Sequence, residues 1–478
     1  MTVQADLARG GLANLTGAAV AGLAGFGVTW VVARGLGPAA AGGFFAGTAA
    51  FALAGTVAKL GTPTGLVYFI ARLRTQGADG AALRRCVRTG VGPVAVAGVL
   101  AGIVMWCTAP RLAAHSPGYL AQLRVLAVFL PAAVLFDTLL AATRGWRRMR
   151  PTVALDRLLR PGLQLGALAL LWLAAVRAPA AYAIAWAAPY AVTAVLAALA
   201  VRNLLPSDAG RAPRLRFWRF TGPRAAASVA HLALQRVDVL LLASLAGLKA
   251  AAVYAVAGRF VVLGQLANQA ILLAVQPRLA ELLSGDDRTG ANAVYQTATG
   301  WLVLAAWPVY LGTAVFASVY LGLFGPAYRT ATGVVVVLGL AMVVGTGCGM
   351  VDTVLAMAGR TSWNLANVVL ALAVNLGVDL ALIPRLGALG AALGFAAATL
   401  ANNLVPLAQV ATVLKLHPFG RATATAAGTA TVCFGVVPLA VAAVLGTTLT
   451  AALVAVALGT AGYAVALARL RHVLHLNR

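Results

Sequence analysis

Long apolar runs separated by short polar segments fill the chain from end to end. Each run reaches about 20 residues, the length an α-helix needs to cross a hydrocarbon core roughly 30 Å thick. Of the 478 residues, 62% are hydrophobic and 10% are charged. The pattern predicts an all-α polytopic membrane protein with about fourteen transmembrane helices, near residues 12–34, 39–70, 86–108, 120–143, 152–176, 179–201, 222–246, 250–282, 292–320, 330–358, 361–383, 387–414, 422–445 and 447–468.

The first apolar run follows a short leader with few charges and is longer than the core of a signal peptide, so we expect it to be retained. Basic residues concentrate in alternate connections between the spans. One set carries Arg72, Arg74, Arg84, Arg85, Arg88, Arg144, Arg147, Arg148, Arg150, Arg202, Arg211, Arg214, Arg216, Arg219 and Arg224. The opposite connections carry one or two each: Arg34, Arg111, Arg177, Lys249, Arg329 and Arg385.

This asymmetry predicts that both termini lie in the cytoplasm, because loops rich in Lys and Arg stay on that side. The net charge of +25 then reflects topology and attraction to anionic lipid rather than nucleic-acid binding. The four cysteines, Cys86, Cys107, Cys348 and Cys433, fall in different segments without a nearby histidine cluster. We therefore expect no disulfide framework and no metal site of that kind.

A weak internal repeat divides the chain. GPAAAGGFFAGTAAF, at 37 to 51, lies 210 residues before GLKAAAVYAVAGRFV, at 247 to 261. Parallel repeats of this kind are common in secondary transporters; the alternative is that Ala-rich and Gly-rich spans resemble each other by composition alone. We expect an N-terminal lobe at 1–203, a cytoplasmic linker at 204–221, a C-terminal lobe at 222–414, and two further spans with a cytoplasmic tail at 415–478.

Three groups of motifs resemble polysaccharide flippases of the multidrug/oligosaccharidyl-lipid/polysaccharide exporter superfamily. They are ARGLGPAAAGGFF with KLGTPTGLVYFIARL near the start, QRVDVLLLASLAGLKAAAVYAVAGRF in the middle, and IPRLGALGAALGF at 383 to 395. The resemblance implies two pseudo-symmetric six-helix lobes in a V shape, with two C-terminal helices. It also implies translocation of undecaprenyl-diphosphate-linked oligosaccharide across a bacterial cytoplasmic membrane by alternating access, for exopolysaccharide and other cell-surface polysaccharide synthesis.

Charged residues inside the spans are the candidate site residues, because each costs at least about 2.5 to 3.5 kcal/mol at the centre of a membrane helix. For a diphosphate cargo we expect cavity-facing cations. Arg259 is the first candidate, followed by Arg236 and Lys59. Arg259 pairing with a carboxylate remains open, and so does a structural ion pair between Lys59 and Asp137, which lie at a similar depth. Asp156, Arg157 and Arg160 lie at the mouth of span 5, where long side chains reach the interface.

Arg236 and Asp238 are two residues apart and so lie about 200° apart around a helix, with separate partners. Asp238, Asn375 and Asp379 reach a similar depth, and Asn375 and Asp379 share a helix face. This set resembles the sodium site of lipid II flippases in the superfamily, with Thr399 or a backbone oxygen near Ala391 as an additional ligand. Two carboxylates and a carboxamide suit a hard cation. Proton coupling and a purely structural cluster are the alternatives.

Other functional classes fit less well. A lipid II flippase remains an alternative, as does a cation-coupled multidrug exporter, although spans 1 to 3 lack the acid expected for proton exchange. A glycosyltransferase would need paired acids in an external loop, and no such pair is present. We therefore expect a transporter rather than an enzyme, without an ATP-binding motif. Partners would be the lipid bilayer, and a glycan polymerase and glycosyltransferases encoded nearby.

Overall fold

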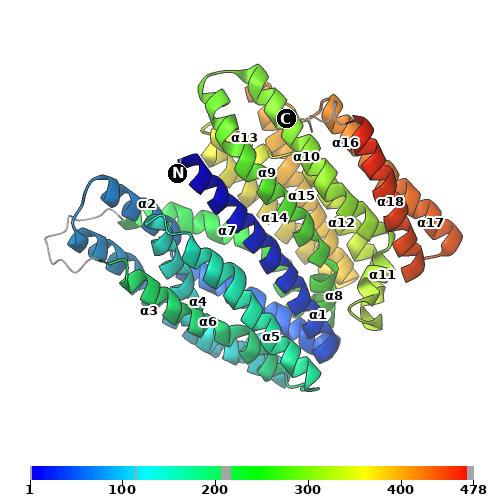
Figure 1. The fold of residues 1–478 in the computed structure, drawn as a ribbon. Coiled ribbons are helices and arrows are strands. Elements are labelled where there is room, and N and C mark those ends of the chain that lie inside the picture. The colour runs from blue at the N-terminus through cyan, green and yellow to red at the C-terminus, as the bar shows by residue number, and fades with distance from the viewer. Residues whose placement is uncertain (1–2, 114–115, 206–216, 471–478) are drawn as a thin grey trace. The chain divides into compact units, whose positions relative to one another are not determined.

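The computed structural model describes residues 3–113, 116–205 and 217–470, which form helices joined by short turns (Figure 1). No strand occurs within these ranges. The chain folds into two compact units, Met1–Ser244 and Leu245–Arg478. Each unit buries its own apolar core between helices, as expected for spans rich in Ala, Val and Leu.

The first unit contains seven α-helices and one π-helical segment within the described residues. They are α1 (Val3–Ala58), α2 (Thr62–Thr75), α3 (Gly80–Ala113), α4 (Pro117–Gly145), the π-helix η1 (Thr152–Leu159), α5 (Arg160–Leu173), α6 (Pro179–Arg202) and α7 (Phe217–Leu245), whose last residue passes into the second unit. Helix α4 packs against α1, α2, α3 and α6, and α5 packs against α1 and α6.

The second unit continues with α8 to α18. Its elements are α8 (Leu248–Ala257), α9 (Arg259–Ser284), α10 (Arg288–Val315), α11 (Ala317–Gly322), the 3-10 helix η2 (Pro326–Ala331), α12 (Thr332–Gly347), α13 (Val351–Met357), α14 (Thr361–Leu386), α15 (Ala388–Gln409), the π-helix η3 (Val410–Leu414), α16 (Arg421–Thr431), the π-helix η4 (Val432–Val436), α17 (Val437–Leu445) and α18 (Leu449–Leu470). The core contacts join α14 to α15, α10 to α9 and α12, and α12 to α15.

Twelve helical stretches of the described chain are long and apolar enough to cross a membrane. They account for the predicted fourteen spans except at two places. Helix α1 runs through a kink at Gly37 and Pro38, so it joins the first two predicted spans. The fifth predicted span is divided into η1 and the 14-residue α5. The protein is therefore a multi-pass membrane protein, and the prediction of an all-α fold is confirmed.

Several predicted spans are interrupted. The second was expected to run from 39 to 70, but α1 ends at Ala58 and Gly61 takes a φ of 68° before α2 begins. Span 8 divides at Gly258, and span 10 divides between Gly347 and Val351, where Gly349 has a φ of 72°. Hydropathy does not detect these breaks, because the residues on both sides are equally apolar.

The internal repeat reappears in the backbone. Gly37 has φ 73° and ψ 170°, and Gly247, 210 positions later, has φ 87° and ψ 167°. Both residues begin an inward-running span by the predicted topology. Two further pairs of residues with positive φ recur 212 positions apart: Arg147 with Gly359, and Ala175 with Gly387. Matching turns at matching intervals support a true repeat rather than a shared composition.

Small residues let the helices of the first unit approach closely. Gly61 and Gly65 of α2 lie against Thr221 and Phe217 of α7, and Gly145 of α4 lies against Ile70. Phe217 is fully buried in the same apolar cluster as α2. The N-terminal end of α7 thus packs within the first unit, whereas the sequence placed span 7 in the C-terminal lobe; the predicted lobe boundaries themselves stay a prediction.

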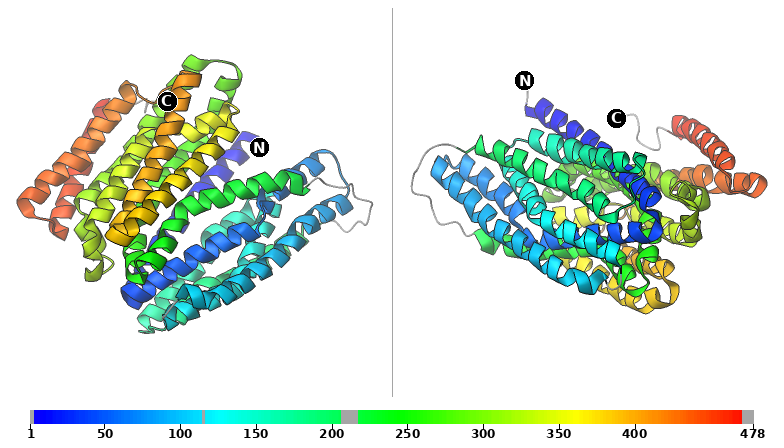
Figure 2. Two further views of the ribbon diagram at one scale, coloured as in Figure 1. Left: turned by 180° about the vertical axis from the view of Figure 1, so that it is seen from behind. Right: turned by 90° about the horizontal axis from the view of Figure 1, so that it is seen from below.

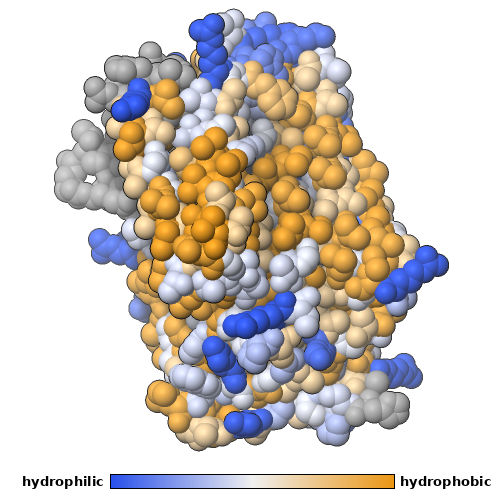
Figure 3. All heavy atoms as spheres, turned by 90° about the vertical axis from the view of Figure 1, so that its right-hand side faces the viewer, coloured by the Kyte–Doolittle hydropathy of each residue, from blue (hydrophilic) through white to orange (hydrophobic). Residues whose placement is uncertain are grey.

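Helices α17 and α18 lie side by side at the edge of the second unit (Figures 1 and 2). Their outer faces expose large apolar side chains, among them Val444, Leu449 and Leu453. Figure 3 shows a broad band of apolar residues with hydrophilic residues above and below it. Such a band is the surface expected of a protein in contact with lipid tails.

Candidate functional site

Lys59, the predicted site residue nearest the N-terminus, follows the end of α1 directly. Its Nζ lies 2.9 Å from Oδ2 of Asp137 on α4, an ion pair between residues 78 positions apart. The side chains are 23% and 41% exposed, so the pair lies at an accessible edge of the packing. Of the two possibilities left open by the sequence, the structure shows the ion pair, and a role of Lys59 in substrate contact would have to involve this pair.

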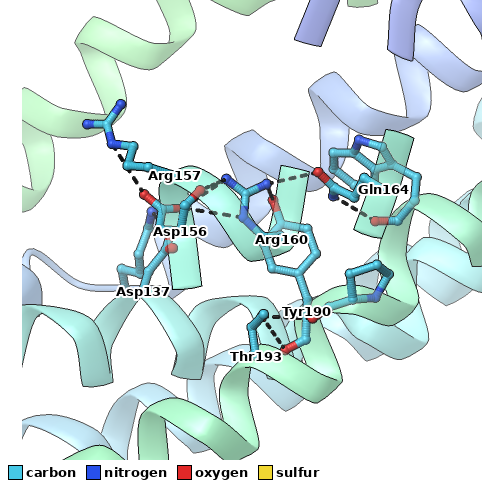
Figure 4. Close-up of polar contacts among 10 residues, drawn as sticks. Asp137, Asp156, Arg157, Arg160, Gln164, Tyr190 and Thr193 are labelled. Carbon is cyan, nitrogen blue, oxygen red and sulfur yellow. Dashed lines mark hydrogen bonds and ion pairs between the residues drawn. The ribbon is translucent and has the colours of Figure 1, made fainter. Parts of the chain in front are cut away.

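A larger polar network surrounds Arg160, at the junction of η1 and α5 (Figure 4). Its Nη2 lies 2.8 Å from Oδ1 of Asp156, and its Nε donates to the same oxygen at 3.3 Å. Its Nη1 donates to Gln164 Oε1 at 3.2 Å and to the Tyr190 hydroxyl at 3.3 Å. Asp156, Arg160 and Gln164 follow one another at four-residue intervals, so they lie along one face of the segment.

Tyr190 links this network to α6. The Arg160 guanidinium lies 5.0 Å from the centre of the Tyr190 ring, and Gln164 Nε2 donates to the backbone oxygen of Trp186 at 2.7 Å. Phe51 and Phe136 pack edge-on or tilted against Tyr190, with ring centres 5.6 and 6.1 Å away. The polar groups are therefore fixed against an aromatic wall.

Arg236 and Asp238 lie in different surroundings on α7, as their spacing predicts. Arg236 is exposed and within electrostatic range of the Tyr190 hydroxyl, whereas Asp238 is only 3% exposed. His231 and Gln235, on the same helix, hydrogen-bond to each other at 3.0 Å and are exposed, unlike Asp238.

Arg259 occupies the first position of α9, immediately after the interruption at Gly258. It is half-buried and interacts electrostatically with Tyr320, whose hydroxyl donates to the Val256 backbone oxygen at 2.9 Å. The sequence placed Arg259 within a continuous span. The structure instead places it at the first residue of a helix, directly after the turn at Gly258.

Asn375 and Asp379 come together on α14, and both are completely buried. They face Gly394 of α15: a Cβ added at Gly394 would overlap Asp379 Oδ1 and would lie 3.4 Å from Asn375 Nδ2. Neither side-chain atom of Asn375 has a hydrogen-bond partner among the described residues. Thr399, the fourth predicted ligand, is also on α15 but packs against Gly345 of α12. A Cβ added at Gly345 would lie 3.1 Å from Thr399 Cγ2.

Asp238 belongs to the first unit, while Asn375 and Asp379 belong to the second. Its participation in a shared cation site therefore stays a prediction. Within the described residues, no group of three or more His, Cys, Asp or Glu side chains is arranged to hold a metal ion. A cation here would depend on the carboxamide and on backbone oxygens in addition to carboxylate.

Sequence reasoning placed Asp156, Arg157 and Arg160 at the mouth of span 5 without assigning them a role. It missed Gln164 and Tyr190, which complete the network. Asn364 donates its Nδ2 to the Asp352 backbone oxygen at 2.7 Å, beside the interruption of span 10. The four-residue spacing of 156, 160 and 164 was visible in the sequence. The contact with Tyr190, 30 residues away, was not.

Comparison with known proteins identifies related chains. The family described as "Polysaccharide biosynthesis protein" matches residues 7–283. A search of curated proteins found no match. Among solved structures, the lipid II flippase MurJ in an inward closed conformation aligns with a TM-score of 0.73 at 12% identity, over 98% of this chain and 99% of that one.

Two further structures align over most of their length. An inward-facing multidrug resistance MATE family transporter of the MOP superfamily gives a TM-score of 0.68 at 17% identity, covering 84% of this chain and 94% of that chain. A MOP superfamily transporter from Pyrococcus furiosus gives 0.58 at 17% identity, covering 85% and 95%. At these identities the alignments establish a common fold.

Proposed function

Because the chain belongs to the polysaccharide biosynthesis protein family, we propose that it is a flippase for undecaprenyl-diphosphate-linked oligosaccharide in the bacterial cytoplasmic membrane. It would supply lipid-linked units for cell-surface polysaccharide synthesis by alternating access. Its nearest functional partners would be the glycosyltransferases that build the unit and the polymerase that consumes it.

One observation carries this proposal: Arg236 is exposed within an apolar helix and forms no ion pair with any described residue. An uncompensated arginine in a membrane helix is costly unless it faces water or an anionic ligand. The guanidinium fork matches the oxygens of a phosphate group. Arg259, half-buried at the start of α9, is the second arginine that we assign to the diphosphate.

The direction of transport also suits an anionic cargo. An inside-negative membrane potential contributes about 2.3 kcal/mol per elementary charge per 100 mV, and it drives negative charge outward. A diphosphate head group carries roughly two such charges, so the potential alone favours export from the inner leaflet.

Export of glycan in a strain that lacks its own flippase tests the proposal. Arg236→Ala and Arg259→Ala should each lower export at least tenfold at unchanged membrane abundance, because each removes a cation from the path of the diphosphate. Arg385→Ala, which removes an exposed arginine from the end of α14, is the matched control and should export normally. Normal export by both Arg236→Ala and Arg259→Ala would return these residues to structural roles.

A lipid II flippase is the second candidate, because MurJ aligns along 98% of this chain, including the C-terminal helices. The two functions differ in the glycan and not in the diphosphate. Reconstituted protein supplied separately with lipid II and with an undecaprenyl-diphosphate oligosaccharide distinguishes them, since the preferred cargo should be translocated faster at equal concentration.

We also propose that Asn375 and Asp379 bind the coupling cation, sodium rather than a proton. The fully buried carboxamide of Asn375 has neither side-chain atom hydrogen-bonded within the described chain, and the Asp379 carboxylate on the same helix packs with it against Gly394. Oxygen ligands of this type suit a hard cation. A bound cation would neutralise the buried carboxylate and so lower the cost of one transport conformation. The Asn375 carboxamide and the Asp379 carboxylate would hold it.

A further inference from the structure

One end of the first unit gathers an excess of positive charge. The residue after α1, the last third of α4, the second half of η1 and the first residue of α5 contribute to it. Their charged side chains form the ion pairs Lys59–Asp137, Arg157–Asp156 and Arg160–Asp156, and Arg144 lies within electrostatic range of both carboxylates. The set comprises four cations and two carboxylates: Lys59, Arg144, Arg157 and Arg160 with Asp137 and Asp156.

Two of the cations are already fully engaged. All five N–H groups of Arg160 have acceptors in Asp156, Gln164 and Tyr190. Lys59 is paired with Asp137 at 2.9 Å. These two residues hold α1, α4, η1, α5 and α6 together, and they have little capacity left for a ligand.

Arg157 and Arg144 are different. The buried Nε of Arg157 has no hydrogen-bond partner among the described residues, and its distance to Asp156 Oδ2 is 3.9 Å, too long for a hydrogen bond. Arg144 forms no side-chain hydrogen bond or ion pair with a described residue, although it lies within electrostatic range of Asp137, Asp156 and Arg157. The mutual repulsion of two such guanidinium groups is relieved when an anion lies between them.

Both arginine side chains are partly exposed, although the Nε of Arg157 itself is buried. A Cβ added at Gly17 on α1 would lie 3.0 Å from the Cβ of Arg157. The absence of a side chain at Gly17 therefore lets the Arg157 side chain pass close to that helix. Figure 4 shows the Arg157 guanidinium pointing away from the Asp156–Arg160–Tyr190 network. The Arg157 side chain is 33% exposed, and the neighbouring Arg144 is half-buried.

We propose that Arg144 and Arg157 form a binding subsite for a phosphate or diphosphate group in the first unit. Two arginine forks offer several N–H donors to tetrahedral oxygens, while Asp137 and Asp156 hold the remaining cations in place. The identity of the ligand as a lipid-linked head group rests on the proposed function. By the predicted topology this end faces the cytoplasm, so the subsite would receive the head group at loading, before it reaches Arg236 or Arg259.

Binding of inorganic pyrophosphate to the purified full-length protein tests the subsite. It is measured as the rise in melting temperature with pyrophosphate concentration at fixed ionic strength. Arg157→Gln and Arg144→Gln should each weaken the apparent affinity about tenfold, the size expected for one charge-assisted contact. Arg157→Lys keeps the charge but loses the fork, so it should bind with intermediate affinity. Arg88→Gln, which removes an exposed arginine from α3, is the matched control and should bind like the wild type.

The melting temperature without ligand reports whether each variant is folded. Unchanged pyrophosphate affinity in folded Arg157→Gln and Arg144→Gln protein would overturn the subsite. So would an equal loss in Arg88→Gln, since that result indicates a general charge effect, and so would absence of binding by the wild type.

Undecaprenyl diphosphate in the same detergent distinguishes the two sources of the phosphate. If its affinity falls with that of pyrophosphate in Arg157→Gln, the ligand is a lipid head group; if only pyrophosphate is affected, the subsite takes a soluble phosphate compound. Transport is measured separately. If the wild type binds pyrophosphate through Arg144 and Arg157 but does not translocate lipid-linked oligosaccharide, the subsite is supported and the proposed function is rejected.

Discussion

Lys59 and Asp137 illustrate how a charged residue is retained in a membrane protein. Each alone would be costly in an apolar helix, but the pair at 2.9 Å neutralises both charges and joins α1 to α4. Because Asp137 is 41% exposed, water screens the pair, and its contribution should fall below the roughly 3 to 5 kcal/mol of a fully buried pair that loses one partner.

We expect Lys59→Ala and Asp137→Ala each to destabilise the first unit by about 1 to 2 kcal/mol. The double variant should lose less than the sum, because no unpaired charge remains. Thermal unfolding of the purified single and double variants measures this coupling. Additive losses would show that the two side chains act independently despite their distance in the structure.

Gly394 gives a direct test of the Asn375 and Asp379 arrangement, because both side chains lie against this glycine. A methyl group there would overlap the carboxylate, so Gly394→Ala should lower the melting temperature and abolish stabilisation by sodium, at a cost of about 1 to 3 kcal/mol for overpacking. Gly377→Ala on α14 is the matched control. Its Cβ would meet nothing within 4 Å, and alanine favours the helix, so this variant should keep or slightly raise stability.

Sodium-dependent melting of the wild type and of Asp379→Asn tests the cation itself. The wild type should melt higher in sodium than in potassium, and Asp379→Asn should show no difference, because the substitution removes the negative charge that attracts the ion. Equal melting of the wild type in both salts would reject the sodium site. Proton coupling and a structural cluster would then remain.

At the scale of elements, glycines at helix interruptions set where the spans begin. Gly37 and Gly247 have nearly the same unusual backbone conformation, and a Cβ at either position would meet nothing within 4 Å. The requirement for glycine is therefore conformational and not steric, since this region of φ and ψ is essentially restricted to glycine.

Gly37→Ala and Gly247→Ala should each cost about 1 to 3 kcal/mol, with similar values because the two positions are related by the repeat. Gly166→Ala, which also meets open space but lies in the regular helix α5, should be neutral or stabilising. Urea or thermal unfolding measures the differences. A neutral effect at Gly37 together with a large one at Gly247 would contradict the equivalence of the two turns.

The sequence predicted the spans well and their interruptions poorly, for a physical reason. Span length and apolarity are local properties of about 20 residues, so α3, α4, α6, α10 and α14 lie close to their predicted ranges. The interruptions at Gly258 and Gly349 arise from packing against other helices. Gly349, for example, lies against Thr299 and Tyr295 of α10, which no local pattern shows.

The candidate sites divide in the same way. The spacing of four residues between Asn375 and Asp379 predicted that they share one face of a helix. In the structure both are buried and lie against Gly394. The Arg160 network depends on Tyr190 from another helix, and the position of Arg259 depends on an interruption that hydropathy does not detect. Contacts between helices were therefore beyond the reach of the sequence pattern.

For the whole molecule, the distribution of arginines predicts the orientation in the membrane. The connection after α2 is flanked by Arg72, Arg74, Arg84 and Arg85, whereas the connection after α5 carries Arg177 alone. Each basic residue near an anionic leaflet contributes about 1 kcal/mol, so the first connection should stay on the cytoplasmic side.

Reporter fusions test this orientation. A fluorescent protein fused after Gln76 or Trp146 should fluoresce, because it folds in the cytoplasm, and alkaline phosphatase fused after Ala175 should be active, because it needs the oxidising exterior. Fusion after Asn203 is a further cytoplasmic check. Active phosphatase after Gln76 would reverse the orientation. With the expected pattern, the end of the first unit that carries Arg144 and Arg157 lies on the side where a lipid-linked substrate is synthesised, as a loading subsite requires.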